Sequence, residues 1–261
     1  MWSYDEDPVP RRDVIGVFGG SGFYEFLSDA SPSPVPTPYG PPSADPMVGT
    51  VAGIDVVFIP RHGRDHQFPP HKVPYRANVD AMRTLGVDRI VGPSAAGSLQ
   101  LDYEPGHFAV PDQIIDRTWG RQHTFFDGPE VEHLSYADPY HPHMRLLAIE
   151  AMRATGVTVH DGGTVVVIQG PRFSTRAESK WFASHGWELV NMTQVPEASL
   201  SAEAGIPYVN ISVITDYDVG VDGGDPVTHE EVLKRFKESS ATLQDGIRKM
   251  IPALAAANMS G

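Results

Sequence analysis

The sequence contains no cysteine. This absence excludes disulfide bonds, thiolate metal sites and a cysteine nucleophile, and it is compatible with a reducing compartment such as the cytoplasm. No apolar run is long enough to span a bilayer, and the acidic residues 1–7 lack the apolar core of a secretory signal. These absences predict a soluble cytoplasmic protein that has no membrane partner.

Basic residues are in the minority. The chain has 20 Lys and Arg against 33 Asp and Glu, which gives a formal net charge of −13 at pH 7. Proteins that bind nucleic acids usually present a basic face to the phosphate backbone, so no nucleic-acid partner is expected. A small anion needs only a locally positive pocket. The length of 261 residues, 41% of them hydrophobic, fits one large domain over 1–261, in which residues 1–12 form a tail.

Two common nucleotide-binding motifs are missing. The apolar run 14–18 enters the glycine-rich segment 19–22, which is typical of a strand followed by a turn. Neither the G-x-G-x-x-G spacing nor a Gly-Lys-Ser/Thr follows, so a dinucleotide fold and a Walker A loop are not predicted. Converging backbone N–H groups at Gly20 and Ser21 can hold a small anion. The residues alone leave a second interpretation open, a tight turn that only needs glycine.

Strand patterns alternate with helical patterns through most of the chain. This alternation predicts an α/β fold with a central mixed or mostly parallel sheet and helices on both faces. The proline-rich segment 31–46 is expected to form an extended excursion on the surface. The expected strands are 14–18, 51–59 (a hairpin with its turn near Gly53), 89–91, 108–115, 163–169, 188–190 and 210–218. The expected helices are 73–85, 144–155, 175–185, 197–204 and one or two between 228 and 256. The helix that follows Thr228 is expected to begin with a capping box formed by Thr228 and Glu231.

The strand at 210–218 ends in two acids. Residues i and i+2 of a strand point the same way, so Asp216 and Asp218 are expected to project together. Ligands of open α/β sheets bind beyond the carboxyl ends of strands. Two carboxyl groups held close together cannot both ionise freely, and one is expected to stay protonated near neutral pH. A solvated acidic turn is the other interpretation of these residues.

Candidate anion ligands follow the predicted hairpin. Arg61 offers a planar fork of donors, and His62 can donate when it is protonated. His66 and His71 lie close in sequence, but no further ligand at tight spacing completes a set, so no metal site is predicted. The small residues of 92–98 are expected to form a loop that a ligand can approach closely. Composition and spacing thus indicate an α/β enzyme that binds a small anion and a planar group.

Several separated motifs together resemble the trimeric nucleoside phosphorylases over nearly the whole chain. They are IGVFGGSG at 15–22, RHG at 61–63, GSL at 97–99, QGPRFSTRAE at 169–178, NMT at 191–193, VPE at 195–197 and TDYD at 215–218. Their order makes the signal specific. The resemblance implies that orthophosphate, as co-substrate, attacks C1′ of a purine nucleoside with inversion, without a metal or other cofactor. The expected substrate is 5′-methylthioadenosine, and adenosine is a possible second one.

The resemblance also assigns roles within the site. Asp216 is expected to protonate or hydrogen-bond purine N7, and Asp218 to accept from the 6-amino group. The backbone of Met192 is expected to hold the ribose. His133 is expected to reach into the site of a neighbouring subunit, which implies a homotrimer. The residues expected to bind phosphate are Gly20, Ser21, Arg61, His62, Ser94, Ala95 and Thr193. The residues expected to bind the base are Phe173, Ser174, Asp216 and Asp218. The residues expected to surround the 5′ substituent are His229, Val232, Leu233 and His133.

Three positions bear on substrate choice. Relatives that prefer 6-oxopurines have Asn in place of Asp216 and Glu in place of Ser174, so both residues favour a 6-aminopurine. His229 instead resembles the histidine with which the 6-oxopurine enzymes contact a 5′-hydroxyl, unless it is simply exposed near a helix N-terminus. A broader purine nucleoside phosphorylase therefore remains an alternative. A non-catalytic nucleoside-binding protein and a dehydrogenase, the latter based only on the turn at 19–22, are the hypotheses from other classes.

Overall fold

The computed structural model describes residues 13–20, 27–224 and 227–257. The predicted tail at 1–12 lies outside the described residues, and the single domain over 1–261 stays a prediction. The strands are β1 (Val14–Gly19), β2 (Ser28–Pro32), β3 (Met47–Val51), β4 (Ile54–Pro60), β5 (Arg89–Val91), β6 (Ser94–Ser98), β7 (Phe108–Val110), β8 (Gln113–Arg117), β9 (Val159–Asp161), β10 (Thr164–Ile168), β11 (Leu189–Asn191), β12 (Tyr208–Val209) and β13 (Ser212–Tyr217). The α-helices are α1 (Tyr75–Thr84), α2 (Pro142–Arg153), α3 (Arg176–Ser184), α4 (Gln194–Glu203) and α5 (His229–Ala256).

The α/β class is confirmed, but the strands form two mixed sheets instead of one central sheet. Their orders are β12-β5-β1-β4-β3-β2 and β8-β10-β11-β6-β13-β7-β9. The chain passes directly between the sheets from β5 to β6 and from β12 to β13. At this crossing Gly92 N–H donates to Val209 and Ser94 N–H donates to Ile211. These bonds, on residues i and i+2, keep the two chains paired across Pro93, which has no N–H to donate to a strand on its other side.

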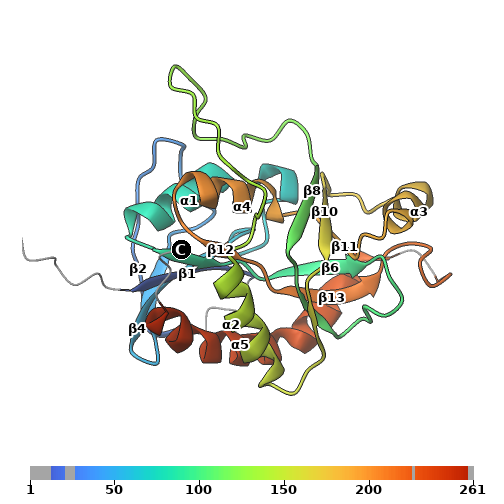
Figure 1. Cartoon of the computed structure of the whole chain (residues 1–261). Helices are drawn as coiled ribbons and strands as arrows, with labels where there is room; N and C mark the ends of the chain where they lie inside the picture. The colour runs from blue at the N-terminus through green and yellow to red at the C-terminus, as the bar shows by residue number, and fades with distance from the viewer. Residues whose placement is uncertain (1–12, 21–26, 225–226, 258–261) are drawn as a thin grey trace, which may run out of the picture.

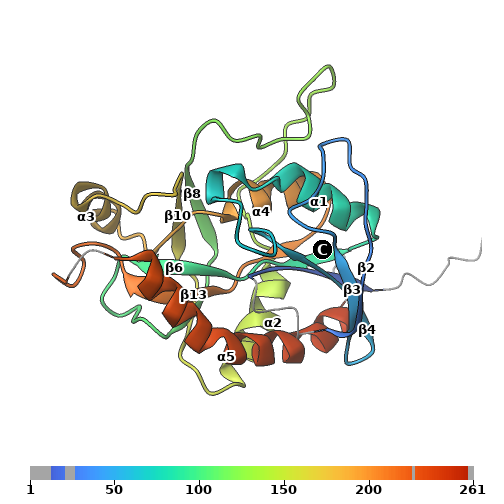
Figure 2. The same ribbon diagram turned by 180° about the vertical axis from the view of Figure 1, so that it is seen from behind.

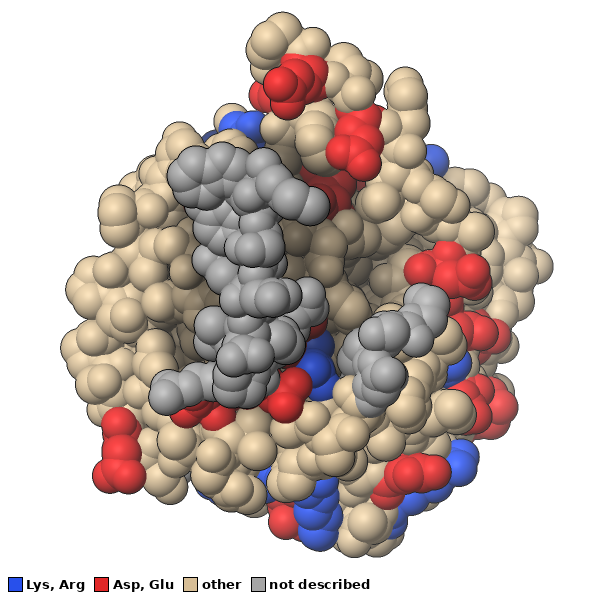
Figure 3. Space-filling view, turned by 60° about the vertical axis from the view of Figure 1, so that its left-hand side comes forward, with Lys and Arg blue, Asp and Glu red and all other residues tan. Residues whose placement is uncertain are grey.

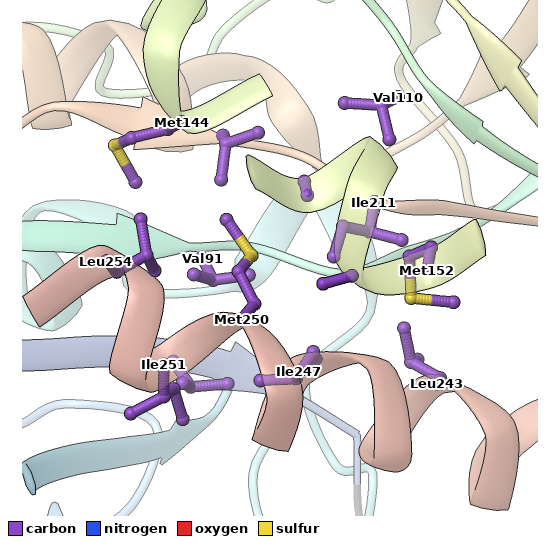
Figure 4. Packing of buried hydrophobic residues seen from close by; sticks show 14 of the residues in the cluster. Val91, Val110, Met144, Met152, Ile211, Leu243, Ile247, Met250, Ile251 and Leu254 are labelled. Carbon is purple, nitrogen blue, oxygen red and sulfur yellow. The ribbon is translucent and has the colours of Figure 1, made fainter. Parts of the chain in front are cut away.

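Helices cover both sides of the strands (Figure 1). Helix α1 packs against α4 on one side and α2 packs against α5 on the other. The view from behind shows α5 running across one side of the molecule (Figure 2), where it contacts β13 of one sheet and β1 and β4 of the other. Buried side chains of α2 and α5 form the main core with strand residues (Figure 4). Among them are Met144, Met152, Leu243, Ile247, Met250, Ile251 and Leu254, with Val91, Val110 and Ile211.

Two local predictions are confirmed. The hairpin is β3 and β4, joined by Ala52 and Gly53 with φ angles of 51° and 80°, values that a two-residue hairpin turn requires and that glycine adopts without strain. At the start of α5, the Thr228 hydroxyl accepts from Glu231 N–H, and the Glu231 carboxylate accepts from Thr228 N–H. This is the predicted capping box. Helix α5 then continues to Ala256, so the C-terminal part is one helix.

Two other local predictions are wrong. The expected strand 108–115 is two strands, β7 and β8, which the chain separates at Pro111 and places beside different partners. The expected loop 92–98 is mostly β6, a strand between β11 and β13. Its small residues fit the crowded centre of the second sheet: a Cβ on Gly97 would lie 2.9 Å from an Asp216 carboxylate oxygen and 3.1 Å from Val190.

The first two residues of the proline-rich segment 31–46 are the last two residues of β2. The rest of the segment has no regular structure before β3 begins. Within it Ser43 is buried. The Ser43 backbone N–H donates to Asn78 Oδ1, and its hydroxyl donates to the carbonyl of Arg61. Part of this surface segment is therefore anchored beneath the residue that follows β4.

None of the helices in the described part of the chain is long and apolar enough to cross a membrane.

Candidate active site

A cavity of about 420 Å³ lies where the two sheets meet. Residues after β1 and β4 of the first sheet line it, together with residues of β6, β11 and β13 of the second sheet and the first turns of α5. The cavity brings together these predicted residues: Gly20, Arg61, His62, Ser94, Ala95, Phe173, Ser174, Met192, Thr193, Asp216, Asp218, His229, Val232 and Leu233. Ser21 lies outside the described residues, and His133 is exposed in loop 118–141 and does not line this cavity.

Arg61 is the cation at one end of the cavity, although only 4% of it is exposed. Its Nε donates to Glu197 Oε2 at 2.6 Å and its Nη2 donates to Glu197 Oε1 at 2.7 Å. Its Nη1 donates to the carbonyl oxygen of Pro93 at 2.9 Å. Because Glu197 is 1% exposed, the two charges form a buried, bidentate pair. The sequence placed Glu197 in a motif but gave no sign that it pairs with Arg61.

Thr193 and Ala95 are tied together by the side chain of Asn191. Asn191 Oδ1 accepts from the N–H groups of Thr193 and Gln194 at the start of α4, and Asn191 Nδ2 donates to the carbonyl of Ala95 in β6. One amide side chain thus fixes two of the cavity walls relative to each other. The Thr193 hydroxyl forms no hydrogen bond with any described residue and lines the cavity, which leaves it available to a ligand.

Burial disfavours the protonated form of His62, in which the sequence expects it to donate to an anion. Burial, together with the charges of Arg61, His66 and His229, lowers the pKa of His62 to about 4. The Nδ1 atom lies 2.8 Å from the carbonyl oxygen of Phe68. Because a carbonyl oxygen only accepts, we assign the proton to Nδ1, and Nε2 is then an acceptor. His62 is therefore suited to receive a hydrogen bond from a protonated phosphate oxygen.

The opposite end of the cavity holds the two acids. A bulge in the pairing of β13 with β6 falls between Ile214 and Asp216, and Thr215 Oγ1 donates to Asp216 Oδ1 at 2.5 Å. Burial raises the pKa of Asp216 to about 6. The Thr215 hydrogen bond opposes this shift, whereas the charges of Asp218 and Glu231 add to it. At pH 7 the ionised form of Asp216 therefore still predominates, with a minor protonated fraction, whereas the sequence predicts that one acid of the pair stays protonated.

Asp218 is buried, with 2% of it exposed. Burial raises the pKa of Asp218, and the nearby hydroxyls of Ser174 and Ser179 partly offset that shift. Their geometry nevertheless falls short of a hydrogen bond: Asp218 Oδ2, Ser174 Oγ and Ser179 Oγ are buried atoms without a partner among the described residues. Buried polar atoms are nearly always paired in folded proteins. Asp218 and Ser174 both line the cavity, and these unpaired atoms lie close together in its wall.

A row of histidines borders the cavity beside an apolar patch. The rings of His62 and His66 stack with centroids 4.5 Å apart, and His66 lies 6.1 Å from His229. The apolar patch consists of Val232, Leu233 and Phe236 with Pro69 and Pro70. The sequence considered His66 only as a metal ligand. Among the described residues, no group of three or more metal-ligating side chains is present.

These features agree with what known proteins show. A family model described as the Phosphorylase superfamily matches residues 14–252. The chain belongs to the phosphorylase superfamily. That membership confirms the predicted family and the prediction of a pentosyl-transferring enzyme.

Relatives in the phosphorylase superfamily cover most of the chain. An S-methyl-5′-thioadenosine phosphorylase of Mycolicibacterium smegmatis is 53% identical over 87% of this chain and 85% of its own. A purine nucleoside phosphorylase of Streptomyces coelicolor is 47% identical over 93% of this chain and 89% of its own. The structure of a methylthioadenosine phosphorylase from Schistosoma mansoni in complex with tubercidin superposes with a TM-score of 0.88, at 36% identity, over 94% of this chain and 93% of that one.

Proposed function

We propose that this enzyme catalyses the phosphorolysis of 5′-methylthioadenosine to adenine and 5-methylthioribose 1-phosphate. The observation that carries the proposal is the base end of the cavity. There a protonatable Asp216 lies next to Asp218 and Ser174, and these cavity-lining side chains supply the kinds of acceptor and donor that the 6-amino group and ring nitrogens of adenine need. The name of the Mycolicibacterium smegmatis relative supports the same substrate.

The geometry suggests how each end of the cavity acts. Orthophosphate, the co-substrate, binds between Arg61 and Thr193, with His62 Nε2 accepting from its P–OH group. A phosphate oxygen then forms a bond to C1′ while the bond from C1′ to N9 breaks. The purine leaves with the electron pair of that bond, and Asp216 donates a proton to N7. Asp218 accepts from the 6-amino group. The reaction needs no metal and no organic cofactor.

The part of the cavity proposed to hold the 5′ substituent also has polar side chains. These side chains favour a second range of substrates. Val232, Leu233 and Phe236 suit a methylthio group, but His66 and His229 border the same region and can hydrogen-bond a 5′-hydroxyl. The Streptomyces coelicolor relative is named a purine nucleoside phosphorylase. The alternative function is therefore a broader purine nucleoside phosphorylase that uses adenosine or 6-oxopurine nucleosides as well.

We further propose that the active form is a cytoplasmic homotrimer in which His133 completes the 5′ end of a neighbouring site. Loop 118–141, which contains His133, projects from the body of the molecule (Figure 1). It carries Trp119 and Val131, which are 73% and 71% exposed. Such exposed apolar side chains support burial against another subunit.

On the face seen in Figure 3, lysine and arginine side chains form no continuous patch, which supports the absence of a nucleic-acid partner.

The deciding experiment measures release of the free base with and without phosphate. We expect adenine release from 5′-methylthioadenosine and adenosine only when phosphate is present. Release without phosphate would indicate a hydrolase, and nucleoside binding without turnover would indicate a binding protein. Inosine belongs in the same panel: if its kcat/KM exceeded that of both adenine nucleosides, the assignment of the base end to Asp216 and Ser174 would be wrong.

The base assignment also makes a prediction for one substitution. Asp216→Asn keeps the shape of the side chain, but its amide donates readily to a purine O6 and cannot transfer a proton to N7. We expect kcat/KM for adenine nucleosides to fall by about 100-fold or more, and the preference to shift towards inosine. Asp245→Asn, an exposed change on α5 far from the cavity, is the matched control. An unchanged base preference in Asp216→Asn would contradict the proposed recognition.

A further inference from the structure

The buried pair of Arg61 and Glu197 lies directly behind the anion end of the cavity. Arg61 lines the cavity, whereas Glu197, in the first turn of α4, does not. Glu197 Oε1 also accepts from the hydroxyl of Tyr208 at 2.8 Å, and Tyr208 is 2% exposed. The carboxylate therefore contacts no substrate, but it holds the residue that does.

The hydrogen bonds of Arg61 determine which of its N–H groups remain for a ligand in the cavity. A guanidinium has five N–H groups. Glu197 takes one from Nε and one from Nη2, and Pro93 takes one from Nη1. Among the described contacts, this leaves one N–H on each terminal nitrogen. Because three hydrogen bonds from two partners define the plane of the group, the two remaining N–H groups have fixed directions before any ligand binds.

The charges at this end also cancel. Glu197 neutralises Arg61 at bonding distance, and His62 is neutral at pH 7. Phosphate therefore meets no free cation in Arg61, but a neutralised pair that presents two N–H groups of fixed direction. Preorganised donors of this kind stabilise developing charge because they need no reorganisation during the reaction.

We propose that Glu197, held by Tyr208, is a positioning residue of the phosphate site, which aims the two remaining N–H groups of Arg61 at the attacking phosphate. This inference rests on the proposed phosphorolysis and deepens it, because it assigns the orientation of the phosphate ligand to a residue outside the cavity. A purely structural role, in which the pair only ties β4 to α4, would lower stability without a selective effect on phosphate.

The test compares KM for phosphate with KM for the nucleoside in Glu197→Gln. One carboxylate oxygen becomes an amide NH₂ that faces an Arg61 N–H, so the bidentate pairing is lost. Small displacements of a positioning group cost up to about 100-fold. We expect KM for phosphate to rise by about 10-fold or more and KM for the nucleoside to change by less than about threefold. The control is Glu203→Gln, which lies on the same helix. Among the described residues, the Glu203 carboxylate accepts a hydrogen bond only from the N–H of Phe125, which is remote from it in sequence.

Tyr208→Phe provides a second, milder variant with the same ring and volume. It removes one hydrogen bond from Glu197 and leaves the bidentate pair, so a rise of about two- to fivefold in KM for phosphate is expected. If Glu197→Gln does not fold, Tyr208→Phe decides alone. An unchanged KM for phosphate, or an equal rise for both substrates, overturns the inference.

A double-mutant cycle shows whether Glu197 acts through Arg61. Lysine cannot form the bidentate pair, so in an Arg61→Lys background Glu197→Gln should raise KM for phosphate much less than it does in the parent enzyme. The same rise in both backgrounds would mean that Glu197 acts elsewhere, and it would overturn the inference. The parent enzyme tests the proposed function separately: base release that needs no phosphate refutes phosphorolysis itself.

Discussion

The chemistry of single residues is set by contacts that the sequence does not contain. Asp216 and Asp218 follow an apolar run, and their grouping could be predicted from strand alternation. The neutral state of His62 could not, because it depends on burial and on the carbonyl of Phe68. The partner of Arg61 lies 136 residues away in Glu197. A buried arginine requires a carboxylate, but the sequence has 33 acidic residues to choose from.

The raised pKa of Asp216 predicts a stability cost that depends on pH. Burial raises this pKa from 3.8 to about 6, so between these values the folded protein binds more protons than the unfolded chain. The contribution of Asp216 to the stability is therefore fully present below pH 4, and it is lost as the pH rises through about 6. The shift of about two pH units corresponds to roughly 3 kcal/mol at most.

Replacement of this carboxyl should therefore stabilise the fold. In urea unfolding, we expect Asp216→Asn to be more stable than the parent by up to about 3 kcal/mol at pH 8, and the difference to shrink as the pH falls from 6 towards 4. Asp245→Asn controls for loss of an exposed carboxylate, and its effect should stay small across the same pH range. A stability difference that is independent of pH would contradict burial of an ionised Asp216.

His229 makes a prediction about the 5′ end. If its ring hydrogen-bonds a 5′-hydroxyl, His229→Val removes that partner and extends the apolar patch of Val232 and Leu233. We expect kcat/KM for adenosine to fall by about 10-fold relative to that for 5′-methylthioadenosine. His143→Val, an exposed change on α2, is the control. An unchanged ratio between the two substrates would mean that His229 is only an exposed residue at the start of α5.

Elements with local signals could be predicted, and elements without them could not. The hairpin around Gly53 and the capping box of Thr228 and Glu231 depend on residues close in sequence. The division of 108–115 and the conversion of 92–98 into β6 depend on pairing with strands far along the chain. Small residues such as Gly97 indicate a loop by composition, but here they fit the close packing inside a sheet.

Helix α5 links the core to the cavity, and its N-terminus carries a prediction. The first turns present His229, Val232 and Leu233 to the cavity, while later turns pack in the core. Thr228→Ala removes the cap, which costs about 1 kcal/mol and should loosen only the first turn. We expect KM for the nucleoside to rise a few-fold and KM for phosphate to stay unchanged. Thr242→Ala, the same change in the middle of this helix, is the control; equal effects of both variants would contradict a local role of the cap.

At the scale of the whole molecule, the site depends on the junction of the two sheets. The proposed phosphate ligands come from residues after β1 and β4 of one sheet and from β6 of the other, and the two acids lie at the end of β13. The sequence predicted one sheet, because the composition of 92–98 indicates a turn. The crossing of two paired chains at this point becomes evident only in three dimensions. The motifs were nevertheless predicted to meet, since each lies at or near a strand end.

The proposed trimer can be tested by complementation between two defective variants. His133→Ala should lose most activity because it removes a group from a neighbouring site, and Asp216→Asn should lose activity in its own site. When the two are co-expressed with different tags and purified through both, only mixed trimers remain, and a site with an intact Asp216 and a neighbouring intact His133 forms in roughly one third of cases. Activity should then exceed the sum of the two variants. Co-expression of Asp216→Asn with the double variant cannot form a complete site and should show no gain. Full activity of His133→Ala alone, or no gain in the mixed assembly, would contradict a site shared between subunits.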